Sequence, residues 1–137
     1  MQNFKSAKIE IMSVSVIIST YNWPEALNLC LKALSLQTSP PDQIIIGDDG
    51  SGEATLKIIE HWKTMLPIEH AWQTDLGFRA ARSRNMALSK VTSDYVICID
   101  GDMVAHPNFV EDHVRFAKEG SFIQGTRASL NLSLIHI

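Results

Sequence analysis

Two aspartates, Asp100 and Asp102, follow an apolar segment in the sequence VICIDGDMVAH, with one glycine between them. Two carboxylates this close repel each other, and the end of a buried strand is an unfavourable place for uncompensated charge. A divalent cation with oxygen ligands, Mg²⁺ or Mn²⁺, would supply the missing charge and share its coordination with substrate phosphates. The small Gly101 lets another group approach closely. The sequence therefore predicts a metal site at Asp100 and Asp102.

Three arginines, Arg79, Arg82 and Arg84, occupy the start of a predicted helix in the segment GFRAARSRN. A helix N-terminus favours acidic groups, so these charges oppose the helix dipole. Arg79 and Arg82 share one helix face, where an anion such as a diphosphate would resolve the conflict. A solvated surface is the alternative interpretation of the same charge run.

Polar residues also follow the three preceding predicted strands. Turn and helix-cap chemistry explains each of them alone, since Asp, Asn, Ser and Gly favour such positions. Ligands of open parallel sheets, however, bind beyond the carboxyl ends of the strands, which lie on one rim. We therefore expect these residues to line one crevice with Asp100 and Asp102. In chain order they are Tyr21 and Asn22, Asp48 and Asp49, and Asp75 and Gly77.

Apolar strand patterns and amphipathic helix patterns alternate along the chain and must position these side chains. Segments rich in β-branched and apolar residues predict strands over residues 13–19, 43–49, 68–73, 94–100 and 121–126. Helical spacing predicts helices that start at Pro24 and cover about residues 58–65, 78–90 and 108–119. This order predicts an α/β fold, a Rossmann-like doubly wound and mainly parallel sheet with right-handed crossovers.

The composition is that of a globular protein with little charge bias. The chain has 137 residues, of which 45% are hydrophobic and 20% charged, and its formal net charge is -3. Without an overall basic field, we expect no nucleic-acid partner. Cys30 and Cys98 fall within a helix and a strand pattern, so we expect both thiols to be buried in the core without a disulfide.

The chain has one predicted domain with two flanking segments. Residues 1–12 read as an N-terminal extension, with Met12 as an alternative start, and residues 13–127 as the folded domain. Residues 128–137 resemble an adaptor-derived tail, so we expect the domain to be truncated at its C-terminus. No segment reaches the length of a signal peptide or a membrane span. We expect a cytoplasmic protein, with peripheral attachment to the inner face of the membrane left open.

Four segments together resemble a known family. VSVIISTYNWPEALNLCLKALSLQT, IIIGDDGS, GFRAARSRNMAL and DYVICIDGDM occur in the order found in the nucleotide-sugar-binding half of family 2 glycosyltransferases. The resemblance runs from about residue 14 to residue 126 and implies a GT-A fold. GFRAARSRN looks especially like enzymes of bacterial surface polysaccharide synthesis.

The resemblance implies a role for each matching residue. Ser19 and Tyr21 would border the nucleotide base, with Tyr21 available to stack on it, while Asp49 would bond the base and Asp48 would support Asp49. Asp102 would bind Mn²⁺ or Mg²⁺, and Asp100 would reach the metal or the ribose. The remaining expected donor-binding residues are Gly77, Arg79, Arg82 and Gly101.

The reaction implied is metal-assisted, inverting transfer from a nucleotide-diphosphate sugar, with a UDP-sugar as the leading donor. The acceptor would be a hydroxyl of a glycan or of a lipid-linked glycan. The family places its catalytic base after the metal motif, and no residue of this chain is assigned that role. Glu111 and Asp112 fall on a predicted structural helix instead.

Two alternatives remain at this stage. The segment VICIDGDMV also fits the nucleophile motif of haloacid-dehalogenase-like phosphatases, in which Asp100 would be phosphorylated. That motif normally ends the first strand of its fold, and its partner residues should follow where little chain remains. The other alternative is an inactive nucleotide-sugar-binding fragment, because the acceptor half is missing.

Overall fold

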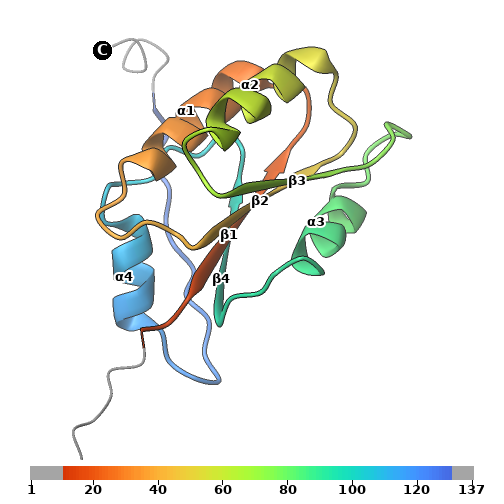
Figure 1. The fold of residues 1–137 in the computed structure, drawn as a ribbon. Helices are drawn as coiled ribbons and strands as arrows, with labels where there is room; N and C mark the ends of the chain where they lie inside the picture. The colour runs from red at the N-terminus through yellow and green to blue at the C-terminus, as the bar shows by residue number, and fades with distance from the viewer. Residues whose placement is uncertain (1–10, 131–137) are drawn as a thin grey trace, which may run out of the picture.

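The computed structural model describes residues 11–130, where strands and helices alternate along the chain (Figure 1). The strands are β1 (Val14–Thr20), β2 (Gln43–Asp48), β3 (Ile68–Trp72) and β4 (Tyr95–Asp100). The helices are α1 (Pro24–Ser35), α2 (Glu53–Lys63), α3 (Ala80–Leu88) and α4 (Phe109–Phe116). Most of the predicted extension (1–12) and of the predicted tail (128–137) lies outside the described residues, and this division of the chain stays a prediction.

The strands form one parallel sheet, which confirms the predicted fold class. Within residues 11–130 the sheet has four strands in the order β3-β2-β1-β4. The register pairs Thr20 of β1 with Asp48 of β2, and Ser19 with Asp100 of β4. The chain moves outward from β1 to β3 and then returns to the other side of β1. The strand order therefore reverses between β1 and β4, which is where open α/β sheets bind ligands.

Helices cover both faces of the sheet, as a doubly wound fold requires. Val16 and Ile18 of β1 point to the face that packs against α1, α2 and α4, while Ile17 points to the face covered by α3. Successive strand side chains alternate between faces, and both faces are apolar here because both are covered. Figure 1 shows α1 and α2 on one side of the sheet and α3 on the other.

Helix α1 begins where the sequence predicts it. Pro24 fits the first turn, where its missing N–H has no intrahelical partner to lose. Leu27, Cys30, Leu31 and Leu34 form the predicted apolar stripe, and all four are buried. This packing fixes the β1–α1 turn at the rim of the sheet.

Helix α3 lies close to the sheet because its contact residues are small. Ser83 and Ala87 are its buried residues, one turn apart. Opposite them, a Cβ added at Gly47 of β2 would meet the Ser83 carbonyl oxygen at 3.2 Å. The helix is shorter than the predicted 78–90, and Arg79 is its N-cap residue. The close approach places the arginine-bearing end of α3 beside the loops that follow β2 and β3.

Two predictions about the C-terminal part of the domain are wrong. Residues 121–126 form no strand, and they are exposed. Cys98 is exposed as well, whereas Cys30 is buried as expected. In the described sheet β4 is an edge strand, so the apolar run of residues 95–100 is not covered as fully as its composition suggested. Burial of Cys30 raises the pKa of its thiol to about 12.

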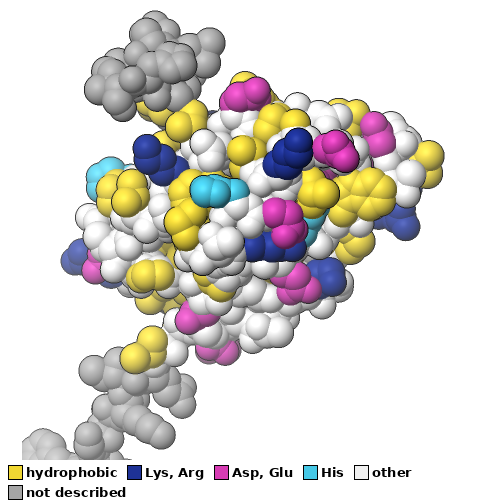
Figure 2. Space-filling model, turned by 45° about the horizontal axis from the view of Figure 1, so that its top comes forward, with side chains coloured by type: hydrophobic (Ala, Val, Ile, Leu, Met, Phe, Trp, Pro, Cys, Tyr) yellow, Lys and Arg dark blue, Asp and Glu magenta, His cyan; other side chains and the backbone are white. Residues whose placement is uncertain are grey.

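The surface over α1 and α2 carries mixed charge. Figure 2 shows this face, on which basic and acidic side chains are interspersed with hydrophobic ones. None of the helices within residues 11–130 has the length and apolar character that crossing a bilayer requires.

Candidate functional site

A small open pocket lies at the carboxyl ends of β1 and β4, where the strand order reverses. Its volume is about 210 Å³. It contains the predicted residues Ser19, Tyr21, Asp100, Gly101 and Asp102, which come from two segments about 80 residues apart in the sequence. The full lining is Ser19, Thr20, Tyr21, Trp23, Asp100, Gly101 and Asp102.

Gly101 holds the D-x-D turn against the end of β1. Its N–H donates to the Ser19 carbonyl oxygen at 2.7 Å. A Cβ at this position would lie 2.9 Å from the same oxygen, closer than side-chain carbons approach backbone. Glycine is therefore required by this close contact, and the contact sets where Asp100 and Asp102 leave the strand.

The two aspartates form a pair of oxygen ligands rather than a complete metal cage. The Asp100 side chain is about half exposed, at 48%, and Asp102 is exposed too. Within residues 11–130, no three His, Cys, Asp or Glu side chains converge so that they could hold a metal ion. Mg²⁺ and Mn²⁺ commonly take one or two carboxylates and complete their coordination with water and substrate phosphates. The donor set fits such a shared site.

Asp49 lies buried at the end of β2, only 5% exposed, and both of its carboxylate oxygens accept hydrogen bonds. Oδ1 accepts from Gln73 Nε2 at 2.6 Å, and Oδ2 accepts from the Arg79 N–H at 2.7 Å. Asp49 thus joins the end of β2 to the residue after β3 and to the start of α3. The Gln73 Oε1 atom is buried and has no hydrogen-bond partner within the described part of the chain.

Asp48, its neighbour, points into the protein. Its Oδ2 lies 2.8 Å from His70 Nε2 on β3, and its Oδ1 accepts the Ser51 N–H at 2.8 Å. Burial raises the pKa of the Asp48 carboxyl, but the hydrogen bonds from His70 and Ser51 outweigh it, and the net pKa lies below the usual value. Asp48 therefore supports the 48–52 loop from within the protein.

Tyr21 is half exposed and lies in the turn that follows β1. Its hydroxyl donates to Asp75 Oδ2 at 2.8 Å, which joins the loop after β1 to the loop after β3. This hydrogen bond to a carboxylate raises the pKa of Tyr21. Asn22 has a positive φ of 45° and accepts the Gly52 N–H through its side chain at 2.9 Å. These two hydrogen bonds join the loop after β1 to the loops after β2 and β3.

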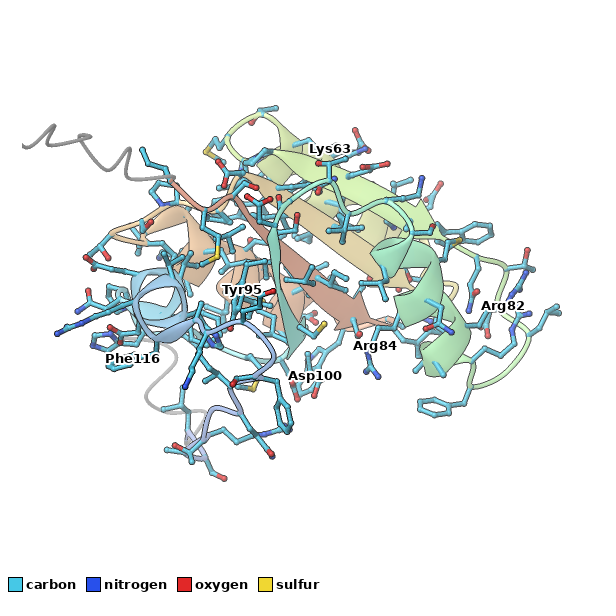
Figure 3. All side chains as sticks on the ribbon, turned by 90° about the horizontal axis from the view of Figure 1, so that it is seen from below. Lys63, Arg82, Arg84, Tyr95, Asp100 and Phe116 are labelled. Carbon is cyan, nitrogen blue, oxygen red and sulfur yellow. The ribbon has the colours of Figure 1, made fainter. Side chains whose placement is uncertain are left out.

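Two of the predicted arginines, Arg79 and Arg82, do not reach the aspartate pair (Figure 3). The Arg79 guanidinium donates to the Thr74 carbonyl oxygen at 2.6 Å, beside β3. Arg82 is exposed, and Figure 3 shows it pointing outward from α3, away from Asp100. Gly77 is exposed with φ 83° in the turn before α3, where a Cβ would meet no atom within 4 Å. Arg84 lies beside the end of β4, near Asp100 (Figure 3). The pKa of the Cys98 thiol on β4 is raised by partial desolvation, and the charge of Arg84 reduces that rise.

A larger cavity of about 890 Å³ adjoins the small pocket. Trp23 and Asp102 line both, so the two spaces meet at these side chains. α1 and the residues after β4 form its walls, together with the segment from Thr126 to Leu130. Most of its lining side chains are apolar.

Several residues of the rim were not identified from the sequence. Gln73 is the first residue after β3. The rule that polar residues after a strand line the rim, which selected Asp75, would also have selected Gln73. Trp23 stands next to the predicted Tyr21-Asn22 pair, but its pattern indicated only a helix start. Arg127 lies near Asp100 through a contact that no local pattern encodes.

Glu111 is not in either pocket, in agreement with its expected structural role. Its carboxylate accepts a hydrogen bond from the Thr38 hydroxyl at 2.8 Å, and it lies in the first turn of α4. Acidic groups stabilise a helix at this position.

Comparisons with known proteins agree on one family. The family model described as "Glycosyl transferase family 2" matches residues 15–133. The hyaluronan synthase of Pasteurella multocida is 36% identical over 104 residues, covering 75% of this chain and 11% of that protein. The chondroitin synthase of Escherichia coli is 29% identical over 115 residues, covering 83% of this chain and 17% of that protein.

A solved structure gives the same result for the fold. TarS residues 1–349 of Staphylococcus aureus, in complex with UDP-GlcNAc, superposes with a TM-score of 0.69 and 28% identity. The match covers 77% of this chain and 31% of that one. The fold is of the GT-A type, and the chain spans between a tenth and a third of the length of these relatives.

Proposed function

The chain belongs to glycosyl transferase family 2, and from this membership we propose that it binds the nucleotide-diphosphate-sugar donor for transfer to an acceptor hydroxyl. The observation that carries the proposal is the pocket at the strand reversal. It unites Tyr21 from the β1–α1 turn with Asp100 and Asp102 from the end of β4. An aromatic ring and two carboxylates on one rim match the two ends of a metal-bound nucleotide.

The base would bind on the β1 and β2 side of the rim. Tyr21 offers a half-exposed ring for stacking, and its bond to Asp75 holds that ring in one orientation. Asp49 would bond the base through lone pairs that its two present contacts leave free. Ser19 would border the nucleoside, while Gly77, Arg79 and Arg82 would line the far side of the donor.

Asp100 and Asp102 would hold Mn²⁺ or Mg²⁺ beside the diphosphate. A bound divalent cation there would neutralise the charge that builds up on the departing nucleoside diphosphate. The hydrogen bond from the Gly101 N–H to the Ser19 carbonyl oxygen would keep the two carboxylates in position for the cation. We propose an inverting transfer, in which the acceptor hydroxyl attacks the sugar directly.

A UDP-sugar is the proposed donor, supported by the TarS complex with UDP-GlcNAc. The proposed acceptor is a glycan or lipid-linked glycan of bacterial surface polysaccharide synthesis, supported by the hyaluronan and chondroitin synthase relatives. The proposed location is the cytoplasm, with attachment to the inner face of the membrane left open. No described carboxylate is assigned as the catalytic base.

Calorimetric titration with UDP, GDP and dTDP, each with and without Mn²⁺, tests the proposal. We expect UDP to bind only with Mn²⁺ and the Asp102→Ala variant to lose this binding by roughly tenfold or more, because a charged ligand is removed. Asp112→Ala is the matched control, since it removes an exposed carboxylate on α4 and should leave binding unchanged.

Other results would point to the alternatives. Metal-independent UDP binding, or equal binding by both variants, would contradict the metal-dependent donor site. Turnover of p-nitrophenyl phosphate through a phosphorylated Asp100 would support the phosphatase alternative, which family membership disfavours. UDP binding without any transfer by this chain would identify it as a binding fragment.

A further inference from the structure

Arg127 lies beside the aspartate pair, although it is 27 positions further along the chain than Asp100. Its Nη1 is 3.7 Å from Asp100 Oδ2, and the two side chains are 70% and 48% exposed. Within residues 11–130, neither Asp100 nor Asp102 takes part in another ion pair. Within the described residues, Arg127 is thus the basic group that forms an ion pair with Asp100.

Arg127 also borders the larger of the two cavities. It lines the larger cavity together with Asp102, while Asp100 and Asp102 line the smaller pocket. The guanidinium therefore faces the space next to both aspartates from the side opposite α3. Arg79 cannot take this place as it stands, because its guanidinium is bonded to Thr74 beside β3.

The contact with Asp100 is weak enough to be exchanged. Exposed ion pairs at such a distance contribute little to stability, since both charges remain solvated and both side chains lose rotational freedom. An arginine fork is also better suited to two oxygens of a phosphate than to one oxygen at 3.7 Å. Arg127 can leave Asp100 without a large penalty.

We propose that Arg127 is an exchangeable counter-ion of the aspartate pair, which neutralises Asp100 until a divalent cation binds and then donates to a phosphate oxygen of the donor. Once Asp100 shares its charge with a cation, repulsion between that cation and the guanidinium favours the move. A diphosphate bound to the same cation would offer Arg127 a new partner. This inference rests on the proposed donor site and adds a residue to it.

If Arg127 exchanges partners in this way, removing its charge should change the affinities for Mn²⁺ and for UDP in opposite directions. The first titration adds Mn²⁺ alone to the 137-residue chain and follows binding by the loss of the free-ion EPR signal. Arg127→Ala should bind Mn²⁺ about twofold to fivefold more tightly than wild type, because the competing guanidinium is gone. UDP titrated calorimetrically at saturating Mn²⁺ should bind the same variant roughly tenfold more weakly, because a charged donor to phosphate is lost.

Two further variants separate charge from geometry. Arg127→Lys keeps the charge, so its Mn²⁺ affinity should stay at the wild-type value while UDP binding falls in part, since lysine lacks the planar fork. Arg115→Ala removes an exposed arginine of α4 that stacks over Phe116, and it should change neither titration.

The outcomes distinguish this inference from the donor-site proposal. Weaker or unchanged Mn²⁺ binding by Arg127→Ala would overturn the counter-ion role, and unchanged UDP binding would overturn the phosphate role. Failure of the wild-type chain to bind UDP with Mn²⁺ would refute the donor site and the phosphate role together. The Mn²⁺ titration without nucleotide would still decide the counter-ion role.

Discussion

The Asp48 carboxylate and the His70 ring are in contact across two neighbouring strands, with Oδ2 and Nε2 2.8 Å apart. Asp48 is almost fully buried, at 1% exposure, and its other oxygen accepts the Ser51 N–H. The pair fastens the 48–52 loop to β3. Asp49, the next residue, is held by Gln73 and the Arg79 N–H instead.

Replacing His70 should therefore destabilise the fold. In His70→Ala the buried Asp48 oxygen loses a partner, and we expect the free energy of unfolding to fall by roughly 1–3 kcal/mol. Urea denaturation followed by circular dichroism at pH 7 measures the change. His61→Ala, an exposed histidine on α2, should shift the free energy by less than about 0.5 kcal/mol. Equal effects of the two variants would show that the contact contributes nothing.

Acid should weaken the fold through the same carboxyl. The pKa of Asp48 is lower in the folded protein than in the unfolded chain, so its contribution is complete above the unfolded pKa, about 3.9. It is lost as the pH falls from there through the folded pKa. Denaturation curves between pH 6 and pH 2 should show Asp48→Asn losing less stability than wild type over this range. Parallel curves would contradict this assignment.

The phenol of Tyr21 should report its bond to Asp75. Removing the acceptor charge in Asp75→Asn should lower the pKa of Tyr21 toward its ordinary value, because the hydrogen bond to the carboxylate raises it. Absorbance at 295 nm during alkaline titration measures tyrosinate formation, with Tyr21→Phe identifying the contribution of Tyr95. An unchanged titration in Asp75→Asn would mean that the bond does not persist in solution.

Gly101 should not tolerate a side chain. In Gly101→Ala the new carbon meets the Ser19 carbonyl oxygen at 2.9 Å, so the D-x-D turn must shift. We expect a loss of about 1–3 kcal/mol in the free energy of unfolding, as for other overpacked sites, and weaker Mn²⁺ binding. Gly125→Ala, where nothing lies within 4 Å, is the control for both measurements. Mn²⁺ binding as tight as wild type would show that the turn does not position the aspartates.

The sequence predicted the positions of the helices and strands better than it predicted which elements pack against one another. Periodicity located the helices and strands that the structure contains up to α4, and Asp49 and Asp100 lie at the ends of β2 and β4 as expected. Cys98 was wrongly expected in the core, because a strand at the sheet edge and a strand at its centre can have the same composition. The predicted strand over 121–126 failed for a related reason, since a short apolar run needs a partner edge to become a strand.

The contacts of the site depend on sheet order, which one sequence does not reveal. Asp48 with His70, Asp49 with Gln73 and Asp100 with Arg127 each join segments more than 20 residues apart. Residue types at strand ends indicate that polar groups will gather. They do not say which of those groups will bond one another and which will face a ligand.

The central position of β1 sets a length scale for recognition. β2 and β4 are both hydrogen-bonded to it, with Thr20 opposite Asp48 and Ser19 opposite Asp100. Adjacent strands are about 4.8 Å apart, so the ends of β2 and β4 are separated by roughly 10 Å. This separation can change only if a strand slips in register, which would turn its side chains to the wrong face. A ligand that engages both ends must be long enough to bridge this distance, which the backbone hydrogen bonds of β1 to its two neighbours keep constant.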